Sequence, residues 1–455
     1  MICTLAEFAR LSGGLLQGGD RAYSALSTDS RTIGAGELFI ALSGPKFDGH
    51  DYALAAAERG AAGVVVGRRL ALNISQIIVD DPLKALQRAA TAWRAGHSLP
   101  IVGVGGSNGK TTTKELIASV LSVRGSCLAT RGNLNNHIGV PLTLMRIRPE
   151  HTAAVVEMGA NARGDIAQLT PWVDPTVGIV TNAGAEHLEG FGDLDGVAAG
   201  EGELYETMAG DAVAVVNADD AYAGLWRRLA GRRQVLTFGL DPAADFRAVG
   251  ARSTAEGPAF RQSFILACPL GEIAVELRLG GAHNVVNALG AAAAAYAVGA
   301  GVDDIRAGLG RVEPVKGRLQ LKMAAGGARL IDDSYNANPS SLDAGFALLK
   351  TLPGEKWLVL GDMGELGSDE VQFHADAGRS ARAAGISRLF AIGALTGHSV
   401  DSFGAGGEWF SSPAALAEKV RPLLGEGVTV LVKGSRLNRL ERVVEVLAGE
   451  PAVQP

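Results

Sequence analysis

The residues best suited to chemistry lie in one short run, Gly105-Gly106-Ser107-Asn108-Gly109-Lys110-Thr111-Thr112. A glycine turn between a strand and a helix start presents backbone N–H groups and the positive end of the helix dipole to an anion. Lys110 would reach the terminal phosphates of a nucleotide, and the Thr111 hydroxyl would bind Mg²⁺. The sequence therefore predicts an ATP site, completed by Gly106, Ser107, Asn108, Gly109 and Thr112.

The residues on either side of this run support the prediction. Residues 100–104 form a short run of mostly branched, apolar side chains, which is typical of a buried parallel strand. Apolar residues at helical spacing then predict a helix from Lys110 to about residue 123. Val104 stands where the strict phosphate-loop pattern has glycine, so an ordinary glycine turn is the alternative. The Gly-Lys-Thr-Thr ending favours the phosphate loop.

Two further polar residues follow the next predicted strands of this region. Glu157 ends the strand near 153–156, and His187 follows the strand near 177–181. The carboxyl ends of parallel strands meet at one edge of a sheet, so both side chains are expected near Lys110. Glu157 is a candidate Mg²⁺ ligand and His187 a second one. The alternative is that His187 is a structural histidine.

A loop rich in amide side chains occupies residues 132–141, Gly-Asn-Leu-Asn-Asn-His-Ile-Gly-Val-Pro. Its Asn133 and Asn136 are candidates for hydrogen bonds to phosphate or substrate. In the N-terminal region, Ser27, Asp29, Ser30, Arg31 and Lys46 combine hydroxyl, carboxylate and cationic groups that suit a uridine diphosphate. Taken alone, that stretch favours a solvated loop over a ligand site.

Bulk composition sets the class of protein. The chain has 455 residues, 47% hydrophobic and 20% charged, which predicts a soluble globular protein of several domains. The formal net charge of −6 argues against nonspecific binding of nucleic acid. Three widely spaced cysteines form neither a disulfide framework nor a zinc motif, and no signal peptide or membrane span is apparent. We therefore expect a cytoplasmic protein without membrane insertion.

Alternating strand and helix patterns predict an α/β protein of three domains. Residues 1–97 form a small α/β domain. Residues 98–312 form the phosphate-loop domain with a mostly parallel sheet, in which 254–269 is an antiparallel excursion. Residues 313–455 form a Rossmann-like, doubly wound domain, with strands near 329–332, 357–361, 388–392, 408–410 and 428–432.

Several motifs together resemble the Mur ligase family. The shortened loop Gly-x-x-Gly-Lys-Thr-Thr is similar to the ATP loop of the superfamily that also contains folylpolyglutamate synthetase. Three segments are similar to those of the members that add D-alanyl-D-alanine. They are the amide-rich loop, Gly361-Asp362-Met363-Gly364-Glu365-Leu366-Gly367, and Val432-Lys433-Gly434-Ser435-Arg436. The resemblance implies an ATP-dependent ligase that joins this dipeptide to UDP-N-acetylmuramoyl-tripeptide through an acyl phosphate, during peptidoglycan synthesis.

The same resemblance implies roles for particular residues. Lys110, Glu157, His187 and Arg318 would be catalytic, and Arg318 would reach the ATP phosphates from the C-terminal domain. Asn284 would contact adenine and Asp333 the ribose. The incoming substrates would contact Asn338, Lys433, Ser435 and Arg436. Asn338-Pro339 is also typical of a helix cap and first turn, so a purely structural role for Asn338 is an alternative.

Two positions depart from the family pattern. Ala282 stands where an arginine is usual, next to the segment that contains Asn284. The second departure concerns a metal ligand. Most Mur ligases hold a second Mg²⁺ with a carbamylated lysine, fourteen residues after the metal-binding histidine. Counted from His187, that position is Glu201, and the chain has no lysine between Lys114 and Lys316. We hypothesise that the Glu201 carboxylate binds the metal directly. The alternative is a weakened metal site or a solvated helix.

Other functions share parts of this pattern. Another Mur ligase or a folylpolyglutamate synthetase-like ligase would have the same central domain. A phosphate-loop switch or hydrolase would turn over ATP without an amine substrate. The expected partners are the two small-molecule substrates, with no nucleic acid, and the chain is expected to be a monomer. Whether the tripeptide ends in lysine or diaminopimelate stays open.

Overall fold

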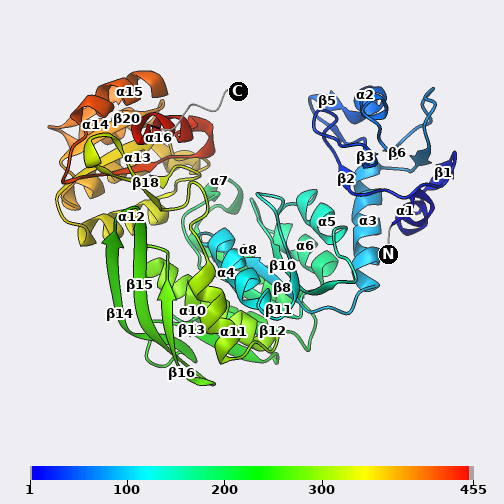
Figure 1. Cartoon of the computed structure of the whole chain (residues 1–455), viewed down its shortest axis with the longest axis horizontal. Coiled ribbons are helices and arrows are strands. Elements are labelled where there is room, and N and C mark those ends of the chain that lie inside the picture. Colours follow the sequence, from blue (N-terminus) through cyan, green and yellow to red (C-terminus); the bar gives the residue numbers. More distant parts are fainter. Residues whose placement is uncertain (1–2, 450–455) are drawn as a thin grey trace.

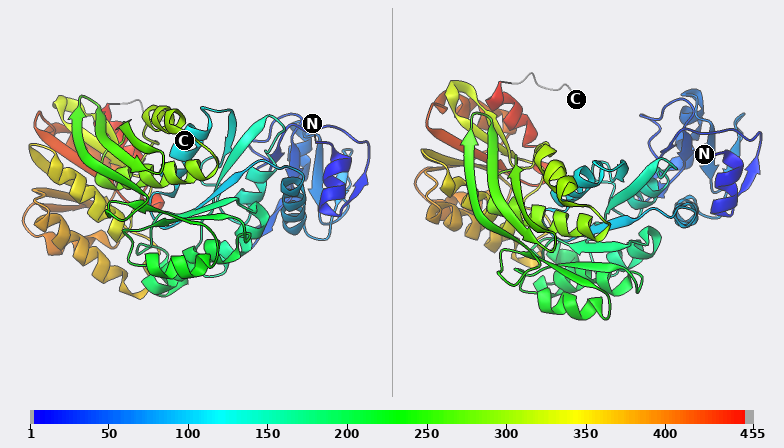
Figure 2. Two further views of the ribbon diagram at one scale, coloured as in Figure 1. Left: turned by 90° about the horizontal axis from the view of Figure 1, so that it is seen from below. Right: turned by 60° about the horizontal axis from the view of Figure 1, so that its bottom comes forward.

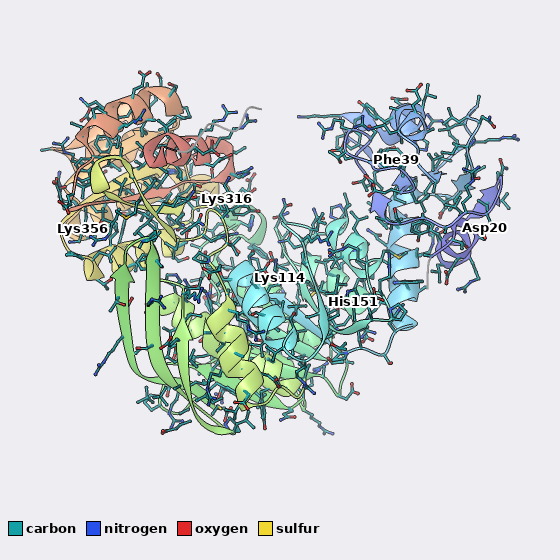
Figure 3. The ribbon with its side chains drawn as sticks, in the orientation of Figure 1. Asp20, Phe39, Lys114, His151, Lys316 and Lys356 are labelled. Atoms are coloured by element: carbon teal, nitrogen blue, oxygen red, sulfur yellow. The ribbon has the colours of Figure 1, made fainter. Side chains whose placement is uncertain are left out.

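Three lobes, each built on its own β-sheet, make up the computed structural model, which describes residues 3–449 (Figure 1). The N-terminal and C-terminal lobes lie at opposite ends of the molecule with the middle lobe between them (Figure 2). Each lobe has buried apolar side chains of its own, such as Phe39 in the N-terminal lobe (Figure 3). The predicted α/β class with three domains is confirmed.

The N-terminal lobe has a five-stranded sheet in the order β1-β7-β6-β3-β2, with β1 antiparallel to β7 and the other pairs parallel. A short hairpin, β4–β5, and a 3₁₀ turn, Gly49–Tyr52, lead into helix α2. The elements are α1 Leu5–Ser12, β1 Leu15–Gln17, β2 Leu26–Ser27, β3 Leu38–Ile40, β4 Ser43–Gly44, β5 Phe47–Asp48, α2 Ala53–Glu58, β6 Gly63–Val66 and β7 Gln76–Ile78.

Helix α3 (Pro82–Ala95) joins this lobe to the middle lobe. The Asp81 carboxylate accepts hydrogen bonds from the N–H groups of Leu83 and Lys84, and Pro82 fits the first turn, so the start of the helix is well defined. The helix packs against α1 and also against α5 and α6 of the middle lobe. Trp93 is buried at this junction and donates a hydrogen bond to Ile147 O at 3.1 Å.

The middle lobe has a nine-stranded sheet in the order β16-β15-β14-β13-β12-β11-β8-β10-β9. Strands β8 to β13 pair in parallel, as predicted. The strands are β8 Ile101–Gly105, β9 Ser126–Ala129, β10 His151–Glu157, β11 Val177–Val180, β12 Val213–Asn217, β13 Val235–Gly239, β14 Phe246–Glu256, β15 Ala259–Cys268 and β16 Gly271–Leu277.

The helices of the middle lobe cover both faces of the sheet. They are α4 Lys110–Leu121, α5 Gly139–Leu144, α6 Asp165–Val173, α7 Leu188–Phe191, α8 Leu194–Thr207, α9 Ala223–Ala230, α10 Ala282–Ala297 and α11 Val302–Arg311. The alanine-rich α10 buries residues 291–295 completely and packs against α4. Small side chains allow the two helices to approach closely, which fixes the helix that begins with Lys110.

The antiparallel excursion is larger than the sequence predicted. It comprises three strands, β14 to β16, rather than the single stretch 254–269. These strands extend from the middle lobe to the C-terminal lobe (Figure 1). Phe260, close to the β14–β15 turn, is 1% exposed and belongs to the apolar core of the C-terminal lobe. The excursion therefore links the two lobes by packing, in addition to the chain connection between α11 and β17.

The C-terminal lobe has a six-stranded sheet in the order β17-β18-β22-β19-β20-β21, parallel except for the edge strand β17. The five predicted strands are present, and the sixth strand, β17, was not predicted from the sequence. The elements are β17 Gln320–Met323, β18 Arg329–Asp333, α12 Pro339–Thr351, β19 Glu355–Gly361, α13 Glu370–Ala383, β20 Arg388–Ile392, α14 Thr396–Phe403, β21 Gly407–Phe410, α15 Pro413–Val420, β22 Val428–Lys433 and α16 Glu441–Ala448. Across residues 3–449, no helix combines the length and the apolar character needed to cross a bilayer.

Candidate nucleotide-binding site

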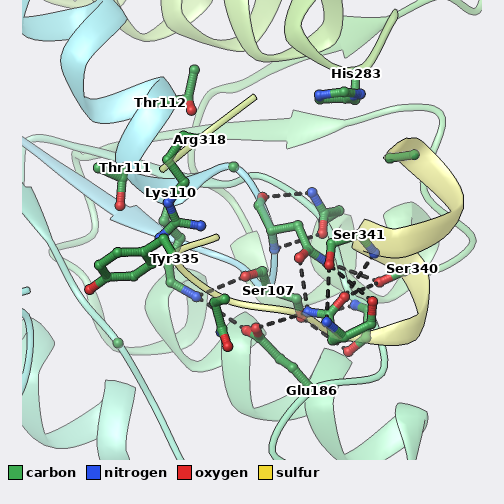
Figure 4. Close-up of a pocket in the computed structure, with 18 of the residues that line it drawn as sticks. Ser107, Lys110, Thr111, Thr112, Glu186, His283, Arg318, Tyr335, Ser340 and Ser341 are labelled. Carbon is green, nitrogen blue, oxygen red and sulfur yellow. Dashed lines mark hydrogen bonds and ion pairs between the residues drawn. The ribbon is translucent and has the colours of Figure 1, made fainter. Parts of the chain in front are cut away.

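A pocket of about 540 Å³ lies where the middle and C-terminal lobes meet (Figure 4). Its walls come from the loop before α4, the ends of β10 and β11, the start of α10, and segments near 318, 333–341 and 433. Fifteen of the predicted residues line it. They are Ser107, Asn108, Gly109, Lys110, Thr111, Thr112, Asn133, Asn136, Glu157, His187, Asn284, Arg318, Asp333, Asn338 and Lys433. Residues separated by more than 300 positions therefore meet in one cavity.

The loop between β8 and α4 needs its glycines for two different reasons. Gly106 and Gly109 have φ of 112° and 83°, which residues with a side chain adopt poorly. A Cβ at Gly106 would lie 2.1 Å from Thr181 Oγ1, and one at Gly109 would lie 2.6 Å from Asn287 Oδ1. Helix α4 has no side-chain cap at its start, so its first N–H groups are free to meet an anion.

The segment after β11 holds this loop in place. Ser107 N donates to Asn182 O at 2.9 Å, and Asn108 N donates to Asn182 Oδ1 at 3.0 Å. Thr181 Oγ1 and Asn182 Nδ2 both donate to Asn108 O, at 2.7 and 2.8 Å. These hydrogen bonds fix the shape of the loop.

Lys110 is turned toward its own loop. Its ammonium donates to Gly106 O and, at 3.0 Å, to Ser107 O, and it lies 3.2 Å from Glu186 Oε1. Burial lowers the pKa of Lys110, but the carboxylates of Glu186, Glu201 and Glu157 outweigh burial and leave this pKa above its usual value. Lys110 is therefore a cation at the edge of the pocket.

Glu157, at the end of β10, is 3% exposed. Its Oε1 accepts a hydrogen bond from Asn135 Nδ2 at 2.8 Å. Its Oε2 lies 3.8 Å from Lys114 Nζ and, among residues 3–449, has no hydrogen-bond partner. A buried carboxylate oxygen without a donor, together with the Thr111 hydroxyl in the same pocket, fits the oxygen ligands that Mg²⁺ prefers.

His187 lines the pocket but has a partner from the other lobe. It precedes α7 with φ of 50°, and its Nδ1 pairs with Glu365 Oε2 of the C-terminal lobe. Within the described part of the chain, no group of three or more histidine, cysteine, aspartate or glutamate side chains is arranged to hold a metal ion. The structure thus brings His187 to the pocket without joining it to Glu157 in such a group.

Glu201 has a position that the sequence did not indicate. It is 1% exposed and does not line the pocket. Helix α8 passes beneath the phosphate loop, and Glu201 Oε2 accepts a hydrogen bond from Gly106 N at 2.6 Å. Burial raises its pKa to about 7, while Lys110 and the Gly106 bond oppose that rise. The structure gives Glu201 a contact with the loop backbone, and its predicted role as a metal ligand stays a prediction.

The C-terminal lobe contributes a buried ion pair and an arginine. Lys433 Nζ lies 2.6 Å from Asp333 Oδ2 and donates to Asn336 O at 3.0 Å. Asp333 Oδ1 accepts from Leu319 N at 3.2 Å, so both predicted ligands already have partners. The Arg318 guanidinium lies over the Tyr335 ring, 4.2 Å from its centroid, where stacking orients it (Figure 4).

The amide side chains at the pocket edge form local hydrogen bonds. Asn284 Nδ2 donates to Gly280 O at 2.7 Å, and Asn284 Oδ1 accepts from Asn287. Asn136 Oδ1 accepts from Ile138 N and Gly139 N and shapes the turn before α5. The neighbouring His283 also lines the pocket, and burial lowers its pKa to about 4, so its ring is neutral near pH 7.

Other predicted residues lie away from this pocket. Arg436 is largely exposed and pairs with Glu441 at 3.2 Å, while Ser435 is buried and accepts from Asn438 Nδ2 at 2.9 Å. The N-terminal set, Ser27, Asp29, Ser30, Arg31 and Lys46, belongs to a different lobe. There the Arg31 guanidinium donates two hydrogen bonds to the Asp29 carboxylate, and Ser27 Oγ contacts the Asp29 backbone. Their predicted roles stay predictions.

Sequence reasoning missed Glu186, which is 8% exposed, lines the pocket and pairs with Lys110. The signal was available, because Glu186 follows a predicted strand and directly precedes His187. It also missed Tyr335, whose ring supports Arg318. No sequence pattern indicates that Tyr335, which follows a different strand, would stack against Arg318.

A phosphate loop follows β8, an inner strand of the parallel part of the middle-lobe sheet, and faces a second α/β lobe across one pocket. This arrangement defines a multidomain P-loop nucleotide-binding protein. Comparison with known families agrees: residues 22–94 match the Mur ligase family catalytic domain, 104–295 the Mur ligase middle domain, and 317–436 the Mur ligase glutamate ligase domain. The chain belongs to the Mur ligase family, as its similarity to full-length relatives also shows.

Several curated relatives carry the name UDP-N-acetylmuramoyl-tripeptide–D-alanyl-D-alanine ligase. The one from Escherichia coli is 40% identical over 98% of both chains, and the one from Haemophilus influenzae is 35% identical over 92% of both. Among solved structures, MurF from Acinetobacter baumannii superposes with a TM-score of 0.91 at 32% identity, covering 99% of both chains. MurF from Thermotoga maritima in complex with ADP superposes with a TM-score of 0.80 at 25% identity, covering 94% of this chain and 97% of that chain.

Proposed function

We propose that this chain is an ATP-dependent ligase that adds D-alanyl-D-alanine to UDP-N-acetylmuramoyl-tripeptide. The products are UDP-N-acetylmuramoyl-pentapeptide, ADP and phosphate, and the reaction serves peptidoglycan synthesis. One observation carries the proposal: a phosphate loop from the middle lobe and cationic side chains from the C-terminal lobe line the same pocket. Relatives with this named activity match the chain over nearly its full length.

The reaction has two bond-forming steps. First, the terminal carboxylate oxygen of the tripeptide attacks the γ-phosphorus of ATP. The bond from that phosphorus to the β,γ-bridging oxygen breaks, ADP leaves, and an acyl phosphate remains. Then the dipeptide amine attacks the acyl carbon, the C–O bond to phosphate breaks, and the nitrogen loses its proton as the amide forms.

The first step brings two anions together, and the chain supplies cations for it. Lys110 lies at the loop that would hold the phosphates, and Arg318 reaches the pocket from the C-terminal lobe. Its planar guanidinium can bind two phosphate oxygens at once. These fixed charges would stabilise the charge that develops on the transferred phosphoryl group.

Thr111 and Glu157 are the residues that would hold Mg²⁺, because a hydroxyl and a buried carboxylate oxygen that accepts no hydrogen bond within residues 3–449 suit it. When bound, the ion would neutralise charge on the triphosphate and orient it. His187, once its contact with Glu365 is given up, and Glu201 are the other proposed ligands. This is the basis of the proposed ATP and Mg²⁺ requirement.

For the other substrates we propose the remaining predicted residues. Ser27, Asp29, Ser30, Arg31 and Lys46 would bind the uridine diphosphate part on the N-terminal lobe. Asn133, Asn136 and Asn338 would contact the peptide. Lys433, Ser435 and Arg436, at the carboxyl end of β22, would bind the dipeptide carboxylate. The proposed domains are 1–97, 98–312 and 313–455, and the three family matches fall within them.

We also propose that the protein works in the cytoplasm as a monomer. The reaction consumes ATP, and the three cysteines are unpaired, as expected of a reducing compartment. Sedimentation analysis with and without substrates would test the monomer.

The decisive experiment measures phosphate and ADP release by the purified protein with ATP and Mg²⁺. Release should require both UDP-N-acetylmuramoyl-tripeptide and D-alanyl-D-alanine, and mass spectrometry should detect the pentapeptide product. ATP turnover that proceeds equally without the amine would indicate the phosphate-loop hydrolase instead. Turnover with a single amino acid in place of the dipeptide would indicate another ligase of the family.

A further inference from the structure

Glu186 joins the two lobes at the nucleotide pocket through its two carboxylate oxygens (Figure 4). Oε1 lies 3.2 Å from Lys110 Nζ, and Oε2 accepts a hydrogen bond from Asn338 Nδ2 at 3.4 Å. The side chains of Lys110 and Glu186 are 14% and 9% exposed, so water screens this pair weakly. The proposed chemistry assigns no role to this carboxylate.

The pair occupies the position where the ammonium would meet an incoming phosphate. Lys110 donates to the carbonyl groups of Gly106 and Ser107 and has Glu186 as its anionic partner. Phosphate oxygens that take the Lys110 ammonium must displace this carboxylate. A carboxylate left next to the phosphates would repel them, so Glu186 needs another partner when nucleotide binds.

Asn338 can provide that partner, because its amide has two separate functions. Its Oδ1 caps α12 by accepting from Ser341 N at 2.8 Å. Its Nδ2 donates to Asn108 Oδ1 at 2.9 Å and to Glu186 Oε2 at 3.4 Å. The cap fixes Asn338 to the C-terminal lobe, while the amide nitrogen contacts the phosphate loop and Glu186 in the middle lobe.

We propose that Glu186 is a positioning residue that holds Lys110 while no nucleotide is bound. When the nucleotide phosphates pair with Lys110, the amide nitrogen of Asn338 donates a hydrogen bond to the displaced Glu186 carboxylate. The C-terminal lobe then favours nucleotide binding by drawing a competing anion off the lysine. By linkage, nucleotide binding favours, to the same extent, the position of that lobe in which Asn338 contacts Glu186. The inference rests on the proposed function only in taking ATP as the nucleotide.

The test is a double-mutant cycle with Asn338→Asp and Glu186→Gln, read by calorimetric titration with ADP. Aspartate caps a helix as well as asparagine does, so Asn338→Asp keeps α12 intact but replaces the donor with a second carboxylate. It should weaken ADP binding roughly tenfold, because Glu186 is pushed back onto Lys110. Glu186→Gln removes the competing charge and should bind ADP at least as tightly as the unmodified protein.

The double variant reverses the pair, with a glutamine amide that donates to the aspartate. ADP affinity should return to within about threefold of that of Glu186→Gln alone. In turnover assays Asn338→Asp should raise the KM for ATP with a smaller effect on kcat. Ser412→Asp is the control, because Ser412 caps α15 of the same lobe, where an added carboxylate faces no phosphate loop.

Three outcomes would overturn the inference. One is an equal loss of ADP affinity from Asn338→Asp whether residue 186 is glutamate or glutamine. Another is a loss from Ser412→Asp as large as that from Asn338→Asp, and a third is unchanged ADP binding in Asn338→Asp. Because ADP titration needs no amine, an unmodified protein that binds ADP but fails to couple the dipeptide would disprove the proposed function alone.

Discussion

Replacing Glu201 by glutamine should make the stability of the protein less dependent on pH. Glu201 is 1% exposed, and its carboxylate contacts Gly106 N beneath the phosphate loop. Burial raises its pKa to about 7 from the ordinary 4.5. Between these two values the folded protein binds more protons than the unfolded chain. The free energy of unfolding therefore falls as pH rises from 4.5 to 7, and this contribution is constant above that range.

The size of the effect follows from the same difference in pKa. At about 1.4 kcal/mol for each tenfold change in proton affinity, ionisation of Glu201 costs ~3 kcal/mol of stability above pH 7. Glutamine keeps the shape and an oxygen for the Gly106 N–H group but cannot ionise. For a domain of this size, the Tm advantage of Glu201→Gln should therefore grow by on the order of 5–10 °C between pH 5 and pH 8.

Differential scanning calorimetry of both proteins at several pH values between 5 and 8 measures this difference. Glu206→Gln is the matched control, because Glu206 lies on the same helix with an exposed side chain. A Tm difference between Glu201→Gln and the unmodified protein that does not change with pH would refute the reasoning. The Mg²⁺ dependence of turnover should also be unchanged in Glu201→Gln, whereas a raised Mg²⁺ requirement would support the metal-ligand hypothesis drawn from the sequence.

Three further predictions concern charge at the site. Lys110→Met should lower kcat at saturating ATP by about 10²- to 10³-fold, because it removes a fixed cation from the developing phosphoryl charge; a smaller than fivefold loss in a coupled ADP assay would contradict this. Lys433→Met should lower the free energy of unfolding of the C-terminal lobe by ~3 kcal/mol in urea, since Asp333 would keep a buried charge, and Asp333→Asn in the same protein should restore most of it. Turnover should be equal in buffer free of carbon dioxide and in bicarbonate, because no lysine lies between Lys114 and Lys316 to be carbamylated there; activity that depends on bicarbonate would contradict this.

Much of the site was predictable because local rules fix it. A strand, a glycine turn and a helix start must produce a phosphate loop, and Gly106 and Gly109 adopt the backbone angles that this loop needs. Glu157 and His187 were placed correctly at the pocket, because parallel strands end at the same edge of their sheet. The Asn338 cap was predicted too, because Asn-Pro is a local signal for a helix start.

Other features depend on how separate elements meet, and spacing along the chain says nothing about that. Glu201 lies 95 positions from Gly106, and only the path of α8 beneath the loop brings them into contact. The pairing of Lys433 with Asp333 joins neighbouring strands that are 100 positions apart in sequence. Similarly, the burial of Phe260 in the C-terminal lobe follows from the reach of the β14–β15 hairpin.

The sequence by itself determined the class of fold, the nucleotide loop and the family, because each depends on residue types at fixed local spacing. The tertiary structure alone decided which charges are already paired: Lys110 with Glu186, Asp333 with Lys433, and His187 with Glu365. The physical reason is that the energy of a charge depends on its burial and on its nearest neighbours in space. Both are set only once the strands within each lobe, and for His187 the two lobes, have packed together.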